Sequence, residues 1–102
     1  MKILKETNIF GRIYRTIFKN NIVDVSRNSD TILWGEMDPE NREIKIYSEL
    51  SEYDKFETYI HELLHACIYE SAIRDSVEDE ERVVDILTKT IADMLIRNNM
   101  LK

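Results

Sequence analysis

The spacing of apolar residues along the chain changes near residue 50. Before this point, apolar and polar residues alternate, and β-branched and aromatic side chains are frequent, as in strands with one buried face. After it, apolar residues recur at steps of three and four, which is typical of amphipathic helices. The pattern predicts an α+β fold, in which a small antiparallel sheet of three to four strands is followed by two helices.

Four segments have strand-like sequences: residues 12–18, 22–25, 31–37 and 43–47. Residues 38–41, Asp-Pro-Glu-Asn, separate the last two segments. They are typical of a turn, because proline presets one backbone dihedral and Asp and Asn favour turn conformations. We therefore expect the last two strands to pair as an antiparallel hairpin with one buried face.

Two amphipathic helices are predicted in the second half of the chain. Ser51 or Ser48 would cap the start of the first helix. The apolar face of this helix consists of Phe56, Tyr59, Ile60, Leu63, Leu64, Cys67 and Ile68. The second helix follows a polar stretch at residues 74–80 and ends near Asn98 and Asn99. Its apolar residues are Val84, Leu87, Ile91, Met94 and Leu95.

Composition and charge narrow the classes of function. The net charge is −6 and Lys and Arg form no run, so a nucleic-acid partner is disfavoured. No apolar stretch is as long as a bilayer requires, so we expect no membrane partner. The single cysteine, Cys67, cannot form an internal disulfide, which suits a reducing compartment. We expect a soluble, cytoplasmic protein with one domain at residues 1–102.

The residues best suited to metal binding and catalysis are concentrated in the first predicted helix. Its two histidines, His61 and His65, are the only ones in the chain, and with Glu62 they form an HExxH motif. Residues four apart lie on one face of a helix, so both imidazoles can bind one ion. Glu62 lies beside them, where it can act as general base on water whose pKa zinc lowers to about 7. We therefore expect one zinc ion as cofactor.

A catalytic zinc site needs a third protein ligand. Cys67 lies about 200° around the helix from His65, on the apolar side, and is interpreted as a core residue. Acidic residues at the head of the second helix are better candidates. Helical phase places Glu81 on the flank of the apolar stripe and Glu80 nearer its middle, which favours Glu81 and keeps Glu80 as the alternative. Asp85, one turn on, could accept the second ring N–H of a histidine ligand.

These motifs resemble those of the gluzincin metallopeptidases, which combine HExxH with a glutamate on a later helix, here in the pattern Glu81-x-x-x-Asp85. The chain is most similar to the compact members: minigluzincins, ImmA/IrrE-type peptidases and small phage-encoded HExxH proteins. The resemblance covers residues 31 to about 97. It implies a minimal zincin-like fold in a bacterial or phage-infected cell, with Glu62 as general base and His61, His65 and Glu81 as zinc ligands.

The resemblance also implies how substrate is bound. In zincins, an edge strand above the HExxH helix pairs with extended peptide, although an ordinary sheet edge is the alternative here. The residues in the matching place are Leu33, Trp34, Gly35, Glu36 and Met37. Thermolysin-like enzymes use a further histidine to stabilise the oxyanion, which this chain lacks. Tyr69 and Tyr47 are the hydroxyl donors considered for that role, but each also fits a packed aromatic residue.

The residues thus predict a zinc-dependent peptidase that acts on a peptide or protein substrate. Two other functions stay open. One is a metal-stabilised interaction or regulatory protein with little catalysis, which the small size of the chain favours. The other is a hydrolase of non-peptide amides, such as cell-wall fragments.

Overall fold

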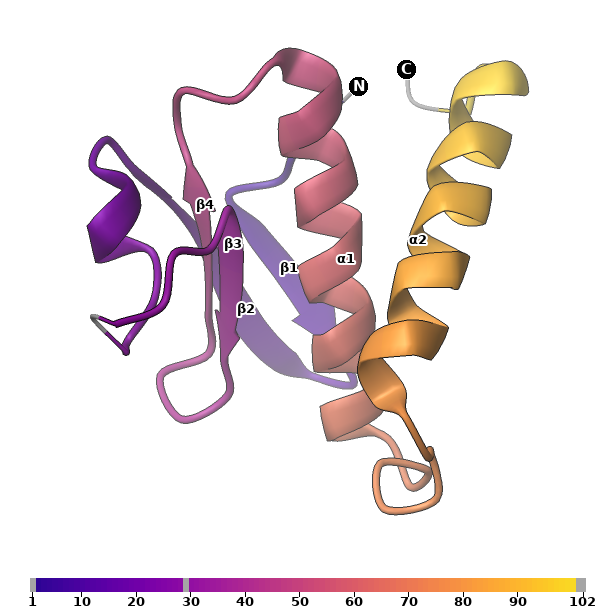
Figure 1. The fold of residues 1–102 in the computed structure, drawn as a ribbon. Helices are drawn as coiled ribbons and strands as arrows, with labels where there is room; N and C mark the ends of the chain where they lie inside the picture. The colour runs from indigo at the N-terminus through magenta and orange to yellow at the C-terminus, as the bar shows by residue number, and fades with distance from the viewer. Residues whose placement is uncertain (1, 29, 101–102) are drawn as a thin grey trace.

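The computed structural model describes residues 2–28 and 30–100, in which a sheet is followed by two long helices (Figure 1). The elements, in chain order, are β1 (Glu6–Ile9), β2 (Arg12–Lys19), the 3-10 helix η1 (Ile22–Asp24), β3 (Gly35–Asp38), β4 (Glu43–Tyr47), α1 (Glu52–Glu70) and α2 (Glu80–Arg97). The predicted α+β class is confirmed.

The four-stranded sheet has the order β1-β2-β4-β3. β1 pairs with β2, and β3 with β4, in antiparallel orientation, whereas β2 and β4 are parallel. The expected hairpin of β3 and β4 is confirmed, but the sheet is mixed rather than wholly antiparallel. The reason is topological. The chain passes from β2 to β3 at the edge and returns in the hairpin as β4, which lies between β2 and β3 and runs in the direction of β2. This order leaves β3 at an edge of the sheet.

Two strand predictions were wrong in detail, and one strand was missed. The segment predicted as a strand at residues 22–25 contains η1, because the Asn21 side chain accepts a hydrogen bond from the Val23 N–H (3.2 Å) and caps one helical turn. Residues 31–34 precede β3 as irregular chain. β1 was missed because its turn into β2 uses Phe10 and Gly11, both at positive φ (53° and 83°), rather than a typical Asn-Gly pair.

The first helix, α1, begins directly after Ser51, whose hydroxyl accepts a hydrogen bond from the Asp54 N–H (3.1 Å). Of the two cap candidates, Ser51 is therefore the observed one. α1 covers one face of the sheet (Figure 1) and packs Phe56 and Tyr59 against the buried Ile44 and Ile46 of β4. This core holds α1 close to β3 and β4, so side chains of α1 lie near the β3 edge of the sheet.

The second helix, α2, lies against α1 on the side away from the sheet (Figure 1). It ends at Arg97, next to Asn98, as expected. Cys67 is exposed, so its assignment to the core was wrong. The buried residues next to it in α1 are Ala66 and Ile68, each about 100° around the helix. Within the described chain, neither helix is long and apolar enough to cross a membrane.

Candidate metal centre

Three predicted ligands meet between the two helices. His61 and His65 lie one turn apart on α1, with ring centroids 4.9 Å apart. Glu81 lies in the first turn of α2 and reaches both rings: its Oε1 is 2.8 Å from His61 Nε2, and its Oε2 is 3.0 Å from His65 Nε2. Two Nε2 atoms and one carboxylate thus face a common point.

This group could hold a metal ion. One ligand atom from each of His61, His65 and Glu81 lies within 4.8 Å of the others. Two imidazoles and a carboxylate form a donor set that suits zinc and leaves a fourth position open. The expectation that Glu81, rather than Glu80, joins the two histidines agrees with this grouping. The residues present therefore fit a divalent transition-metal ion.

The outer nitrogen of each imidazole has its own carboxylate partner. His61 Nδ1 lies 3.3 Å from Asp85 Oδ1, as expected. His65 Nδ1 lies 2.5 Å from Glu80 Oε2, a contact that helical phase did not predict. An Nδ1–H that donates to a carboxylate leaves the Nε2 lone pair for an ion and fixes the ring plane. Glu80, the alternative ligand candidate, thus contacts the outer nitrogen of His65.

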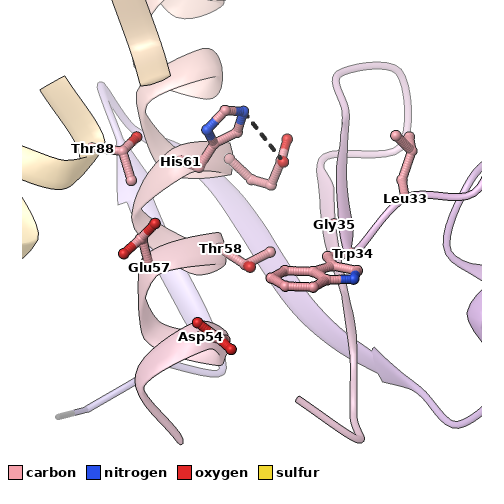
Figure 2. Close-up of a pocket in the computed structure, with 9 residues that line it drawn as sticks. Leu33, Trp34, Gly35, Asp54, Glu57, Thr58, His61 and Thr88 are labelled. Carbon is pink, nitrogen blue, oxygen red and sulfur yellow. Dashed lines mark ion pairs between the residues drawn. The ribbon is translucent and has the colours of Figure 1, made fainter. Parts of the chain in front are cut away.

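Glu62 is buried beside the histidines, with 7% of its surface exposed. Its Oε2 is 4.0 Å from His61 Nε2, the contact drawn as a dashed line in Figure 2. Burial raises the pKa of Glu62 to about 7, and the Glu81 charge adds to the rise, while His65 and the Met37 backbone N–H oppose it. A divalent cation nearby would lower this pKa, because opposite charge favours the ionised form.

The edge strand β3 and the residues before it border the same site. A cavity of about 350 Å³ separates them from the ligands. On the strand side it is lined by Leu33, Gly35, Glu36 and Met37, and on the helix side by His61, Glu62, His65 and Glu81. Trp34, the fifth residue predicted for this edge, lines an adjoining cavity that also contacts His61. All five residues thus lie next to the candidate metal centre.

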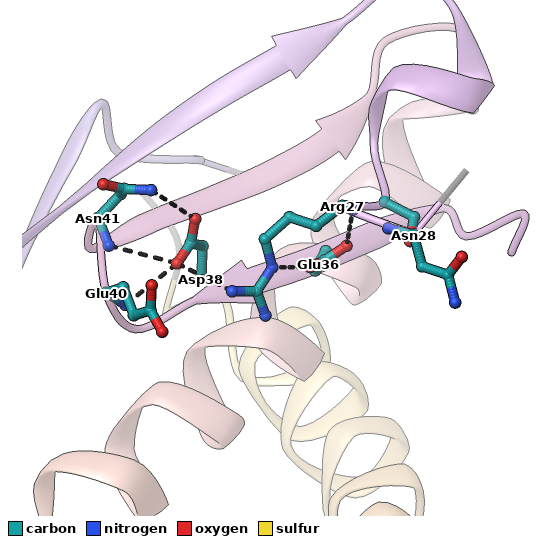
Figure 3. Close-up of polar contacts among 7 residues, drawn as sticks. Arg27, Asn28, Glu36, Asp38, Glu40 and Asn41 are labelled. Atoms are coloured by element: carbon teal, nitrogen blue, oxygen red, sulfur yellow. Dashed lines mark hydrogen bonds and ion pairs between the residues drawn. The ribbon is translucent and has the colours of Figure 1, made fainter. Parts of the chain in front are cut away.

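An ionic cluster joins Arg27 to two side chains of β3 (Figure 3). The Arg27 guanidinium contacts Glu36 Oε1 at 2.5 Å and Asp38 Oδ1 at 3.3 Å. Asp38 is almost fully buried and also accepts hydrogen bonds from the side chain and backbone of Asn41. Arg27 was not identified from the sequence, because nothing in the spacing of charges along the chain shows which acids a loop arginine will contact.

The tyrosines considered as oxyanion donors lie elsewhere among the described residues. Tyr69 stacks with Arg74 near the end of α1 and borders a separate cavity. Tyr47 lies at the end of β4 and lines neither cavity at the metal centre. Thr88 borders one of these cavities, and among the described residues its buried hydroxyl has no hydrogen-bond partner.

Comparisons with protein-family models, with curated proteins and with solved structures gave no match. The functional assignment therefore depends on the arrangement of side chains at this centre.

Proposed function

We propose that this chain is a zinc-dependent peptidase. The observation that carries the proposal is the convergence of His61 Nε2, His65 Nε2 and the Glu81 carboxylate beside the buried Glu62. A structural site would use its ligands to close the coordination sphere, whereas three ligands and an adjacent acid suit catalysis. The resemblance to gluzincins, carried by the same residues, supports this reading.

Zinc is the ion that best suits these donors. Imidazole nitrogen and carboxylate oxygen together favour zinc over the hard cations Mg²⁺ and Ca²⁺, which prefer oxygen ligands alone. When bound, the ion supplies a Lewis acid that polarises the substrate carbonyl and acidifies water. Asp85 and Glu80 hold the two rings in the orientation that this binding requires.

Glu62 would transfer the proton during hydrolysis. Its carboxylate accepts a proton from the attacking water and then donates it to the leaving amine. Burial and the neighbouring Glu81 raise the pKa of Glu62, and a bound divalent cation would lower it, which favours the ionised form that acts as a base. The low exposure of Glu62 also removes competing bulk water from the proton's path.

The edge strand offers a place for the substrate backbone. β3 pairs with β4 on one side only, so its other side can pair with an extended peptide. Gly35 approaches α1 so closely that a Cβ there would lie 2.5 Å from Thr58 Cγ2. Glycine thus keeps β3 near Glu62, where a paired peptide would bring its carbonyl to the metal centre.

The Glu62→Gln variant tests this proposal. It removes the base but keeps the size of the side chain, so hydrolysis of a peptide library should fall by about 10²–10⁴-fold with zinc content unchanged. The matched control is Glu49→Gln, because Glu49 is exposed and outside both cavities. Full cleavage by Glu62→Gln would refute a role for Glu62 in the reaction.

A binding function is the second candidate, and the surface of α2 favours it. Val83, Ile86, Leu87 and Met94 lie on one flank of α2 and are 37%, 57%, 42% and 45% exposed. Exposed apolar patches often mark protein-binding sites. If binding alone is the function, Glu62→Gln keeps the biological effect of the protein and Ile86→Glu loses it. Peptidase activity predicts that Glu62→Gln loses the effect.

A further inference from the structure

A second cavity, of about 240 Å³, adjoins the metal centre on the side of the α1 N-terminus. His61 and Glu62 line one end of it, so it opens directly onto the proposed reaction site (Figure 2). Pockets that enclose drug-sized ligands are larger, at about 300–1,000 Å³. The cavity therefore has room for a single side chain next to the bond that Glu62 acts on.

Two carboxylates, Asp54 and Glu57, lie on the α1 wall of this cavity. Both are partly buried, and within the described chain neither forms an ion pair with a basic side chain. The helix dipole favours an acidic residue at Asp54, because this residue lies in the first turn of α1. It does not account for Glu57, which lies one turn further along α1 and whose carboxylate oxygens can accept several hydrogen bonds.

A third polar group, from α2, borders the same cavity. Thr88 is 2% exposed and its hydroxyl has no hydrogen-bond partner. Its side chain projects from α2 toward α1 (Figure 2). A buried polar group without a partner costs free energy, which a small shift toward a donor in the cavity would recover. The partly exposed carboxylates can form hydrogen bonds with water, whereas the buried Thr88 hydroxyl cannot.

The opposite wall is apolar and aromatic. Trp34, 53% exposed, and Leu33 form it, and Thr58 of α1 lies across from Trp34 (Figure 2). An indole face attracts cations, and it also covers the methylene stem of a long side chain. The cavity thus combines an apolar wall for a stem with acceptors for a charged head.

We propose that this cavity binds a lysine or arginine side chain of the substrate, next to the scissile bond. The inference rests on the proposed peptidase function and specifies its substrate class. The alkyl stem packs on Trp34, and the cationic head pairs with Asp54 and Glu57. Peptides with an acidic residue at this position are rejected, because two carboxylates would face a third.

Binding tests the cavity separately from catalysis. Trp34 is the only tryptophan in the chain, so its fluorescence reports on occupancy. The zinc-loaded Glu62→Gln protein is titrated with capped tripeptides that differ only in a central lysine, norleucine or glutamate. We expect the lysine peptide to bind about tenfold more tightly than norleucine, a difference of about 1.4 kcal/mol. Equal binding of these two peptides would overturn the inference.

Matched variants identify the groups responsible. Asp54→Asn with Glu57→Gln should remove the preference for lysine over norleucine. Glu52→Gln is the control, because Glu52 lies in the same region of α1 but outside the cavity. If the double variant keeps the preference, the assignment to these carboxylates is wrong.

Cleavage by the wild-type protein gives the second measurement. In a peptide library, cleaved bonds should have Lys or Arg at one fixed position, with kcat/KM about tenfold above leucine. Cleavage without this preference would overturn the inference and leave the peptidase proposal standing. Lysine-selective binding without any cleavage would support the cavity assignment and contradict the peptidase proposal.

Discussion

At the scale of single residues, the centre depends on which ring nitrogen each carboxylate contacts. Glu81 faces both Nε2 atoms, while Asp85 and Glu80 each face one Nδ1 atom. The first arrangement suits a ligand, and the second suits groups that orient a ligand. We therefore expect the adjacent glutamates at the start of α2 to have different roles, which substitution can separate.

The first prediction compares Glu81→Gln with Glu80→Gln. Glu81→Gln removes a charged ligand, so stoichiometric zinc should be lost on dialysis. Glu80→Gln keeps all three ligands but weakens the hold on His65, so zinc affinity should fall by about 10–100-fold. Competition with a fluorescent chelator measures both affinities, with Glu78→Gln as the control for loss of one exposed charge. Equal affinity losses in the two variants would contradict the distinction.

At the scale of elements, the distance between β3 and α1 depends on one glycine. A Cβ at Gly35 would lie 2.5 Å from Thr58 Cγ2 and 3.2 Å from the Lys45 carbonyl oxygen. The prediction is that Gly35→Ala destabilises the fold by about 1–3 kcal/mol, as overpacking does. Thr58→Ser deletes the clashing methyl, so the double variant should recover much of this loss in urea unfolding. Additive effects would show that the contact is not the cause.

The ionic cluster of Arg27, Glu36 and Asp38 should stabilise β3 in a way that depends on pH. Burial raises the pKa of Asp38, but hydrogen bonds from Asn41 and the Arg27 charge lower it by more, so the net direction is down. A carboxyl with a lowered folded-state pKa contributes stability above its unfolded pKa of about 3.9, and this contribution is lost as pH falls through the folded-state pKa.

Asp38→Asn should therefore destabilise the protein by about 1–3 kcal/mol at pH 7 and by less at pH 3. Urea unfolding at the two pH values measures the difference. Asp24→Asn, at an exposed acid of η1, is the control and should change stability little at either pH. A loss that is the same at both pH values would contradict the ionised state of Asp38.

The sequence predicted those elements whose signals are local. Helical phase and a serine cap located α1, and the spacing of His61 and His65 predicted that both rings lie on one face, because a helix converts sequence spacing directly into geometry. The parallel pairing of β2 with β4 is set by a connection through η1 and β3, which no local pattern encodes. The contact of Glu80 with His65 was not predicted, because helical phase alone does not show which side chain of the neighbouring helix a residue contacts.

At the scale of the whole molecule, the candidate metal centre lies at the contact between α2 and α1. α2 packs mainly on α1, and its buried residues are the small or medium-sized Val84, Thr88 and Ala92. Two of the candidate ligands come from α1 and one from α2. An ion bound at this point would therefore cross-link α2 to the rest of the fold.

The last prediction is that zinc slows opening of α2 more than opening of the sheet. At free zinc of about 100 times Kd, binding adds about 2.7 kcal/mol to any opening that breaks the site. Amide exchange in α2 should then slow by about 100-fold, while β1 and β2, which contribute no ligand, change less. The His65→Ala protein should show the fast α2 exchange of chelated wild type, with or without zinc. Uniform slowing across both layers would mean instead that α2 does not open on its own, and that the ion stabilises the fold only as a single cooperative unit.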